Sequence, residues 1–120
     1  MVYASSSIAL ACLEALVHIT GERPLPLVRW LVAIEIPAEQ WQLRTSLMEE
    51  VPSGWDAKPS QTSTKDWGDR WLASQNSLIA EGHAVIVPEE GNQLINPVHP
   101  YGSELKATVF RRWSSDSRLL

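Results

Sequence analysis

The chain has few of the residues that mark disulfide, metal or nucleic-acid chemistry. Cys12 is the single cysteine and there are three histidines among 120 residues, so no internal disulfide can form and no HxxxH or CxxC ligand pair is present. Ten Lys and Arg against fourteen Asp and Glu give a formal net charge of −4, whereas a duplex-binding surface needs clustered basic side chains. We therefore expect no metal site, no direct nucleic-acid partner and a reducing, cytoplasmic location.

Common catalytic loops and targeting segments are missing as well. The sequence contains no Gly-rich phosphate loop, GxSxG elbow or HExxH helix, so it gives no support to Ser-His-Asp chemistry. The apolar segment 1–19 has no Lys or Arg before it, and Glu14 and His18 interrupt it. It therefore predicts neither a secretory signal nor a membrane span, and we expect it to belong to the fold.

What is present predicts one mixed α/β (α+β) domain with a small mixed sheet and flanking helices. Apolar residues make up 44% and charged residues 20% of the chain, which is a globular composition. Residues 1–4 are expected to end a strand, and Ser5 or Ser6 to cap a helix that runs to about Thr20. The alternation of apolar residues over 27–37 predicts a second strand.

The second half of the chain predicts a helix followed by short strands. After a short helical pattern in 37–50, Ser63 can cap a helix over 65–75, whose Trp67 and Trp71 share one face and should enter the core. Four extended segments follow: 77–80, 84–88, 93–97 and 107–113.

The first helix carries an unusual carboxylate. Nearly every residue of IALACLEALVHI is apolar, yet Ser7, Ala11, Glu14 and His18 fall on one face. This face is either the narrow solvated stripe of a core helix or a polar line that places Glu14 at the floor of a cleft. Spacing alone leaves both interpretations open.

The stretch PEEGNQLINPVHP also carries two interpretations. Its prolines break strands, while Asn92 and Asn96 suit turns with local side-chain-to-backbone hydrogen bonds. Glu90 and His99 are then either parts of a turn cluster or the polar lining of a site.

Five segments, taken in order along the chain, resemble the RES family. They are VYASSSIALACLEALVHI, VAIEIP, GDRWLAS, VIVPEEGNQLINPVHP and SDSRLL. The most specific is the run E-x-N-x-L-x-N-P-x-H-P from Glu90 to Pro100. On these motifs residues 1–120 are identified as a RES domain that spans essentially the whole chain.

The resemblance implies a fold similar to that of ADP-ribosyltransferases of the diphtheria-toxin type. It also implies a bacterial toxin of a toxin–antitoxin pair, which causes growth arrest by consuming NAD. NAD is its substrate, cleaved at the nicotinamide–ribose bond by hydrolysis or phosphorolysis, or used for ADP-ribosyl transfer. The expected partners are an Xre-type antitoxin and a second copy of this chain. The alternative is a catalytically impaired RES fold that acts as an antitoxin-binding module.

The resemblance assigns three site positions. Tyr3 corresponds to the aromatic residue at the nicotinamide end, Glu14 to the catalytic carboxylate, and Ala84 stands where the family has its Ser. The family's Arg, in a Gly-Arg-Trp-Asn-like segment upstream of the Tyr, has no counterpart. We therefore expect an N-terminally truncated or variant member that cleaves NAD poorly or not at all, because a phosphate anchor and a hydroxyl are both missing.

Overall fold

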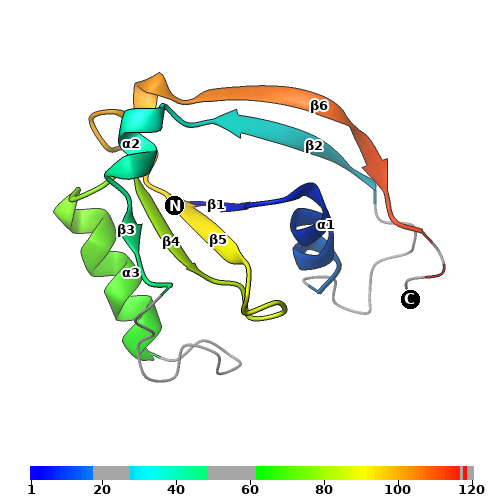
Figure 1. Cartoon of the computed structure of the whole chain (residues 1–120), viewed down its shortest axis with the longest axis horizontal. Coiled ribbons are helices and arrows are strands. Elements are labelled where there is room, and N and C mark those ends of the chain that lie inside the picture. Colours follow the sequence, from blue (N-terminus) through cyan, green and yellow to red (C-terminus); the bar gives the residue numbers. More distant parts are fainter. Residues whose placement is uncertain (18–27, 49–61, 117, 119–120) are drawn as a thin grey trace.

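Two β-sheets and three α-helices make up the described part of the computed structural model, which covers residues 1–17, 28–48, 62–116 and 118. The elements in chain order are β1 (Val2–Ser5), α1 (Ile8–Val17), β2 (Val28–Glu35), α2 (Ala38–Gln42), β3 (Thr45–Ser46), α3 (Thr62–Ser74), β4 (Ile79–His83), β5 (Gly91–Ile95), the 3₁₀ turn η1 (Gly102–Glu104) and β6 (Lys106–Ser114). The predicted mixed α/β class is confirmed (Figure 1).

The four-stranded sheet carries the first strand at its edge. Its strand order is β1-β5-β4-β3, with β1 and β4 antiparallel to β5 and β3 parallel to β4. Helix α1 leaves the end of β1, while α3 lies beside the β3 and β4 side of the sheet (Figure 1). The sheet therefore places the start of the chain and the β4–β5 hairpin next to each other.

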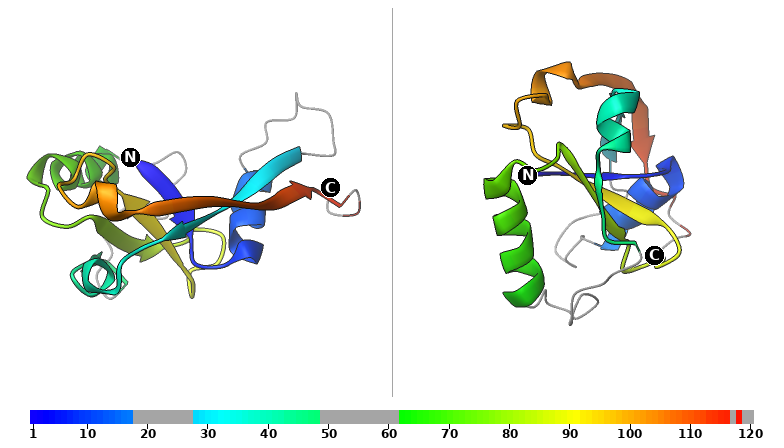
Figure 2. Two further views of the ribbon diagram at one scale, coloured as in Figure 1. Left: turned by 90° about the horizontal axis from the view of Figure 1, so that it is seen from above. Right: turned by 60° about the vertical axis from the view of Figure 1, so that its left-hand side comes forward.

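The second sheet is a long two-stranded ribbon. β2 pairs antiparallel with β6, and a bulge between Leu31 and Val32 leaves Phe110 as the extra residue on β6. Figure 2 shows the ribbon as a separate layer that crosses the four-stranded sheet and joins it on the side of α2. A two-stranded ribbon has little core of its own, so its stability depends on what packs against it.

The buried core lies where the ribbon meets the sheet. Leu78, Ile79 and Ile95 are at most 1% exposed, and Ile34 of β2 and Trp41 of α2 pack against them. Further along the same strand, Trp30 is 62% exposed. One end of the ribbon is therefore anchored in the core and the other end is not.

The predicted core face of α3 is confirmed. The Trp67 and Trp71 rings stack with centroids 6.3 Å apart, and Trp71 is buried. The Trp71 Nε1–H donates to Ser77 Oγ at 3.0 Å, which satisfies the indole donor inside the core. The helix begins at Thr62, so Ser63 lies within it rather than before it.

Two further local predictions were wrong, and one strand was missed. The cap of α1 is Ser7, not Ser5 or Ser6, because Ser7 Oγ accepts the Leu10 N–H at 3.1 Å. Residues 84–88 form the turn of the β4–β5 hairpin rather than a strand, since the Ala84 N–H turns back to Glu90 O at 2.9 Å. Strand β3 was missed because its two residues are recognised only by pairing with β4. The predicted end of the first helix at Thr20 lies outside the described residues.

Among the helices that the structure describes, none is long and apolar enough to cross a membrane.

Candidate functional site

Glu14 lies on α1, whose first turn is fixed by Ser7, and it accepts a hydrogen bond from β5. The Ser7 carbonyl accepts the Ala11 N–H at 3.0 Å, so the first turn of α1 is closed by Ser7 through both its side chain and its backbone. Seven residues later, Glu14 is half-buried, and its Oε1 accepts a hydrogen bond from Asn92 Nδ2 at 2.9 Å. Glu14 is therefore directed toward the sheet, which is not how a solvated stripe would orient it.

Asn92 links this carboxylate to the first strand. Ser5 Oγ donates to Asn92 Oδ1 at 3.0 Å, and the two residues are direct cross-strand partners in the β1–β5 register. The polar chain Ser5–Asn92–Glu14 thus joins β1, β5 and α1. The carboxamide uses its acceptor toward β1 and its donor toward α1.

Tyr3 shares a sheet face with this polar chain. Tyr3 pairs with Leu94, and Ser5, two residues further on, pairs with Asn92. Side chains at i and i+2 point to the same face of a strand, about 7 Å apart. The structure therefore brings Tyr3 and the Asn92-bound Glu14 to one face at the edge of the sheet, and the Tyr3 side chain is 72% exposed there.

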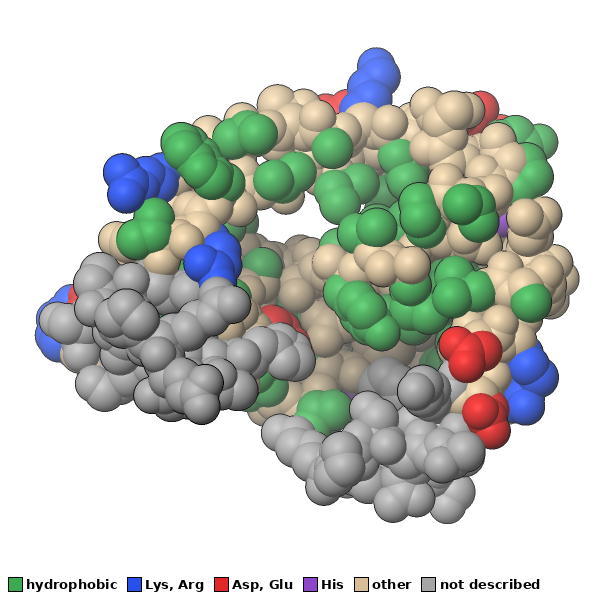
Figure 3. Space-filling model, turned by 180° about the vertical axis from the view of Figure 1, so that it is seen from behind, with side chains coloured by type: hydrophobic (Ala, Val, Ile, Leu, Met, Phe, Trp, Pro, Cys, Tyr) green, Lys and Arg blue, Asp and Glu red, His purple; other side chains and the backbone are tan. Residues whose placement is uncertain are grey.

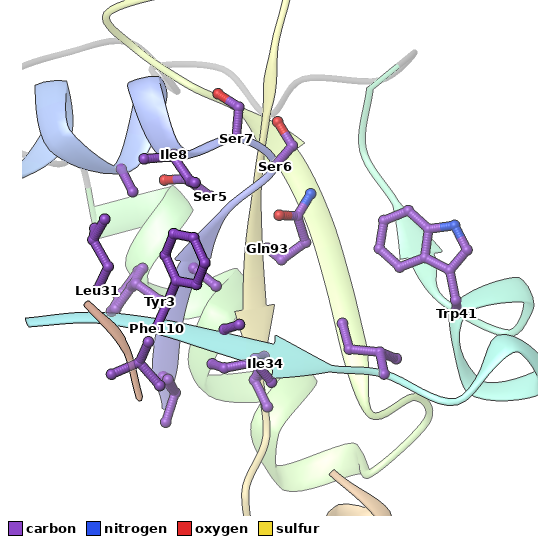
Figure 4. A pocket seen from close by; sticks show the side chains of 17 residues that line it. Tyr3, Ser5, Ser6, Ser7, Ile8, Leu31, Ile34, Trp41, Gln93 and Phe110 are labelled. Carbon is purple, nitrogen blue, oxygen red and sulfur yellow. The ribbon is translucent and has the colours of Figure 1, made fainter. Parts of the chain in front are cut away.

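An open cleft of about 870 Å³ runs along β1, the first turn of α1 and the inner part of β2. In Figure 4 its side chains extend from Leu31 and Ile8 at one end to Trp41 at the other. None of its described lining residues is charged, and the polar groups come from Tyr3, the serines 5–7 and Gln93. Figure 3 shows an opening between the ribbon and the rest of the molecule, rimmed by hydrophobic side chains.

Glu14 is not among the described residues that line this cleft, and the β5 side chains that line it, Gln93 and Ile95, alternate along the strand with Asn92. Ala11, one turn before Glu14 on the same helix, is part of the lining, as is Tyr3. Ser7, at the start of the same helical face, also lines the cleft and donates to Glu90 Oε1 at 3.5 Å. His18, the last member of the predicted stripe, lies outside the described residues.

Ala84 does not join the other two predicted site residues. It is fully buried just after β4 and is not among the described residues that line the cleft. His99 is also apart from the cleft lining, and its ring stacks on Tyr101 with centroids 5.8 Å apart. Tyr3 and the Asn92-bound Glu14 thus share a face of the sheet, and Ala84 does not join them.

Cys12 offers little reactivity at neutral pH. Burial raises the pKa of its thiol, and the positive charge of Arg111 on β6 opposes that rise only in part. The thiolate, which is the nucleophilic form, is therefore scarce at neutral pH. Within the described ranges no three His, Cys, Asp or Glu side chains gather as metal ligands.

Asn92 is the site residue that sequence reasoning did not find. It was expected in a turn, but it lies within β5 and makes contacts far along the chain. The expected local turn is instead made by Asn96, whose Oδ1 accepts the Val98 N–H at 3.2 Å. The only sequence signal for Asn92 was its place in the E-x-N-x-L-x-N-P-x-H-P run.

The arrangement combines an exposed aromatic ring, a carboxylate held by Asn92 and several hydroxyls at the start of α1. A carboxylate held next to a sugar can stabilise positive charge that develops on the anomeric carbon. An aromatic face can pack against a flat heterocycle. This chemistry fits cleavage of a bond between a ribose and an aromatic base.

Comparison with known proteins shows the family. The RES domain model matches residues 1–116. The chain is 43% identical over 121 residues to the Prs ADP-ribosylating toxin of Sphingobium sp. (strain YBL2), and the match covers 100% of this chain and 74% of that protein. It is 37% identical to Toxin Res of Yersinia enterocolitica, over 82% of this chain and 62% of that protein. It is 33% identical to Toxin Res of Photorhabdus laumondii, over 99% of this chain and 75% of that protein. The chain therefore belongs to the RES domain family.

Proposed function

We propose that this chain is a toxin that cleaves NAD at the nicotinamide–ribose bond, with Glu14 as the catalytic carboxylate. The observation that carries the proposal is the placement of Tyr3 and Glu14 on one sheet face through the Ser5–Asn92–Glu14 chain. The similarity to a protein named an ADP-ribosylating toxin supports it, because NAD is the usual donor of ADP-ribose.

The chemistry requires little proton transfer at the leaving group. Nicotinamide is cationic in NAD, so it departs with the electrons of the C–N bond as a neutral molecule. The ribose then carries oxocarbenium character, which the Glu14 carboxylate stabilises, while Tyr3 packs on the nicotinamide ring. Water, phosphate or a protein side chain then bonds to the anomeric carbon, which gives hydrolysis, phosphorolysis or ADP-ribosyl transfer.

The biological part of the proposal is a bacterial toxin that arrests growth in the cytoplasm by lowering NAD. Its partner is an antitoxin of the Xre type that blocks the cleft. The relatives named Toxin Res support a toxin–antitoxin setting in general. No direct contact with nucleic acid and no metal cofactor enter this proposal.

The test is nicotinamide release from NAD with the protein in excess over substrate. Glu14→Gln should lower the rate on the order of 10²–10³-fold, which is the size of effect expected for one group that stabilises transition-state charge. Glu104→Gln is the matched control, because Glu104 is exposed on η1 and is not among the residues lining the cleft. Equal rates for Glu14→Gln and the unmodified protein would overturn the site.

The second candidate is an antitoxin-binding module without NAD cleavage. Ala84, fully buried at the position of the family's Ser, is the observation that favours it. Expression of the chain with an Xre-type antitoxin distinguishes the two. Complex formation with unchanged cellular NAD in the absence of antitoxin would favour the module, and a fall in NAD that Glu14→Gln abolishes would favour the enzyme.

A further inference from the structure

Asn92 stands at the junction of β1, β5 and α1, and neither the family comparison nor the site prediction gives it a role. We propose that Asn92 is a positioning residue that orients the Glu14 carboxylate relative to the face carrying Tyr3. The proposal rests on the proposed function and deepens it, because it names the group that fixes the geometry of the carboxylate.

The Asn92 carboxamide makes one hydrogen bond to α1 and one to β1. Its Nδ2 donates to Glu14 Oε1 at 2.9 Å and its Oδ1 accepts from Ser5 Oγ at 3.0 Å. The Glu14 carboxylate fixes which end of the carboxamide faces it, since a carboxylate only accepts, and the Ser5 hydroxyl then donates to the carboxamide oxygen. The side chain therefore presents an N–H to α1 in one defined orientation.

The backbone at Asn92 is held by neighbouring strands on both sides, so its side chain starts from a fixed position. The residue lies in the middle of the sheet, paired with Ser5 of β1 on one side and with Gly82 of β4 on the other. Its neighbour Gly91 is buried, and an added Cβ there would meet Glu81 Cγ at 3.3 Å, so β4 and β5 are tightly packed. A bond from Asn92 thus ties Glu14 to an interior strand of the four-stranded sheet.

A neutral hydrogen-bond donor suits the orientation of a catalytic carboxylate better than a cation does. A glutamate side chain has several rotatable bonds, and one strong hydrogen bond selects a single orientation among its rotamers. An arginine or lysine would also orient the carboxylate, but it would neutralise the charge needed next to an oxocarbenium-like ribose. An amide such as that of Asn92 orients the carboxylate without adding a positive charge of its own.

A direct test, independent of activity, follows the Asn92 side-chain amide by NMR. Its Nδ2 proton resonance should move with pH as Glu14 takes up a proton, and Glu14→Gln should abolish that movement. The Asn76 side-chain amide, which is exposed, is the control signal and should not respond to Glu14→Gln. A pH-independent Asn92 resonance, or one that Glu14→Gln leaves unchanged, would overturn the proposal whatever the protein catalyses.

The kinetic test uses Asn92→Ala and Asn92→Asp in the nicotinamide-release assay. Misplacing a catalytic group without removing it should lower kcat about 10–100-fold and change KM less than about threefold. Asn92→Asp keeps an acceptor for Ser5 but places a second carboxylate beside Glu14. The acidic limb of its pH–rate profile should therefore move up by about one pH unit, because neighbouring carboxylates share a proton.

Glu90→Ala is the matched control for a merely structural role. Glu90 also ties the β4–β5 hairpin to α1, through Ser7 at 3.5 Å, but it does not touch Glu14. It should leave kcat and the pH profile unchanged. If Asn92→Asp and Glu90→Ala alter kcat equally and neither shifts the pH profile, Asn92 only holds the helix. If Glu14→Gln itself has no effect on cleavage, the proposed function fails rather than this inference.

Discussion

Asn96, directly after β5, bonds through its side chain and its backbone to α3, to Leu78 before β4 and to the segment that follows β5. It is fully buried, and its Nδ2 donates to Leu72 O at 3.2 Å at the end of α3. Its backbone N–H donates to Leu78 O, and its Oδ1 accepts from the N–H of Val98. The carboxamide therefore pairs with backbone groups of α3 and of the segment that follows β5.

Asn96→Ala should lower the free energy of unfolding by about 2–3 kcal/mol, because it removes two hydrogen bonds and leaves a buried carbonyl unsatisfied. Urea denaturation followed by tryptophan fluorescence measures the loss. Asn76→Ala is the control: Asn76 is exposed, and its replacement should change stability by less than about 0.5 kcal/mol. A loss below about 1 kcal/mol for Asn96→Ala would show that water replaces the carboxamide.

Strand β2 has two halves with different energetic roles. Trp30 and Ile34 are four positions apart on β2, so their side chains point to the same side of the ribbon. Ile34 packs on the Leu78, Ile79 and Ile95 core, whereas Trp30 is 62% exposed. The strand is thus stabilised by tertiary packing at its α2 end, whereas among the described residues pairing with β6 is the main support of its other end.

Ile34→Ala should therefore cost about 2 kcal/mol of stability, at the lower end of the range for core truncations because Ile34 is only half-buried. Trp30→Ala should cost less than about 0.5 kcal/mol, although it removes many more atoms. Thermal or urea unfolding of the two variants at low protein concentration compares them directly. A loss for Trp30→Ala as large as that for Ile34→Ala would mean that the outer half of the ribbon is covered in solution.

The whole molecule is more open than a packed domain of its length. Its radius of gyration is 15.2 Å, compared with about 13.6 Å for a compact chain of this size. Five large apolar side chains of the ribbon are exposed: Val28, Trp30, Val32, Val109 and Phe110. Together with the opening in Figure 3, they leave apolar surface in contact with water.

We expect such a surface to favour association, with a second copy of the chain or with a partner protein. The apparent melting temperature should rise by at least about 3 °C over a hundredfold increase in protein concentration, since association stabilises the folded state by mass action. Sedimentation velocity should show the same concentration dependence. The double variant Trp30→Ser, Phe110→Ser should abolish both effects. A melting temperature independent of concentration, with a single monomeric species, would contradict the expectation.

Several features of the fold could be predicted from the sequence because they depend on local patterns. Alternating apolar residues identified β2, and the spacing of Trp67 and Trp71 identified the core face of α3. A carboxylate in an otherwise apolar helix singled out Glu14 as a candidate before any contact was known. In each case the signal lies within one element, so neighbouring residues are enough to carry it.

Only the tertiary structure decided how these elements meet. The hydrogen bonds from Asn92 reach Glu14 and Ser5 across 78 and 87 residues of sequence, and no local periodicity encodes a contact at that distance. Strand β3 exists through its pairing with β4, and Ala84 is buried because the chain turns at residues 84–90 rather than continuing as a strand. Residue types thus determined which groups were available for chemistry, whereas strand register and hairpin closure decided which of them share a face.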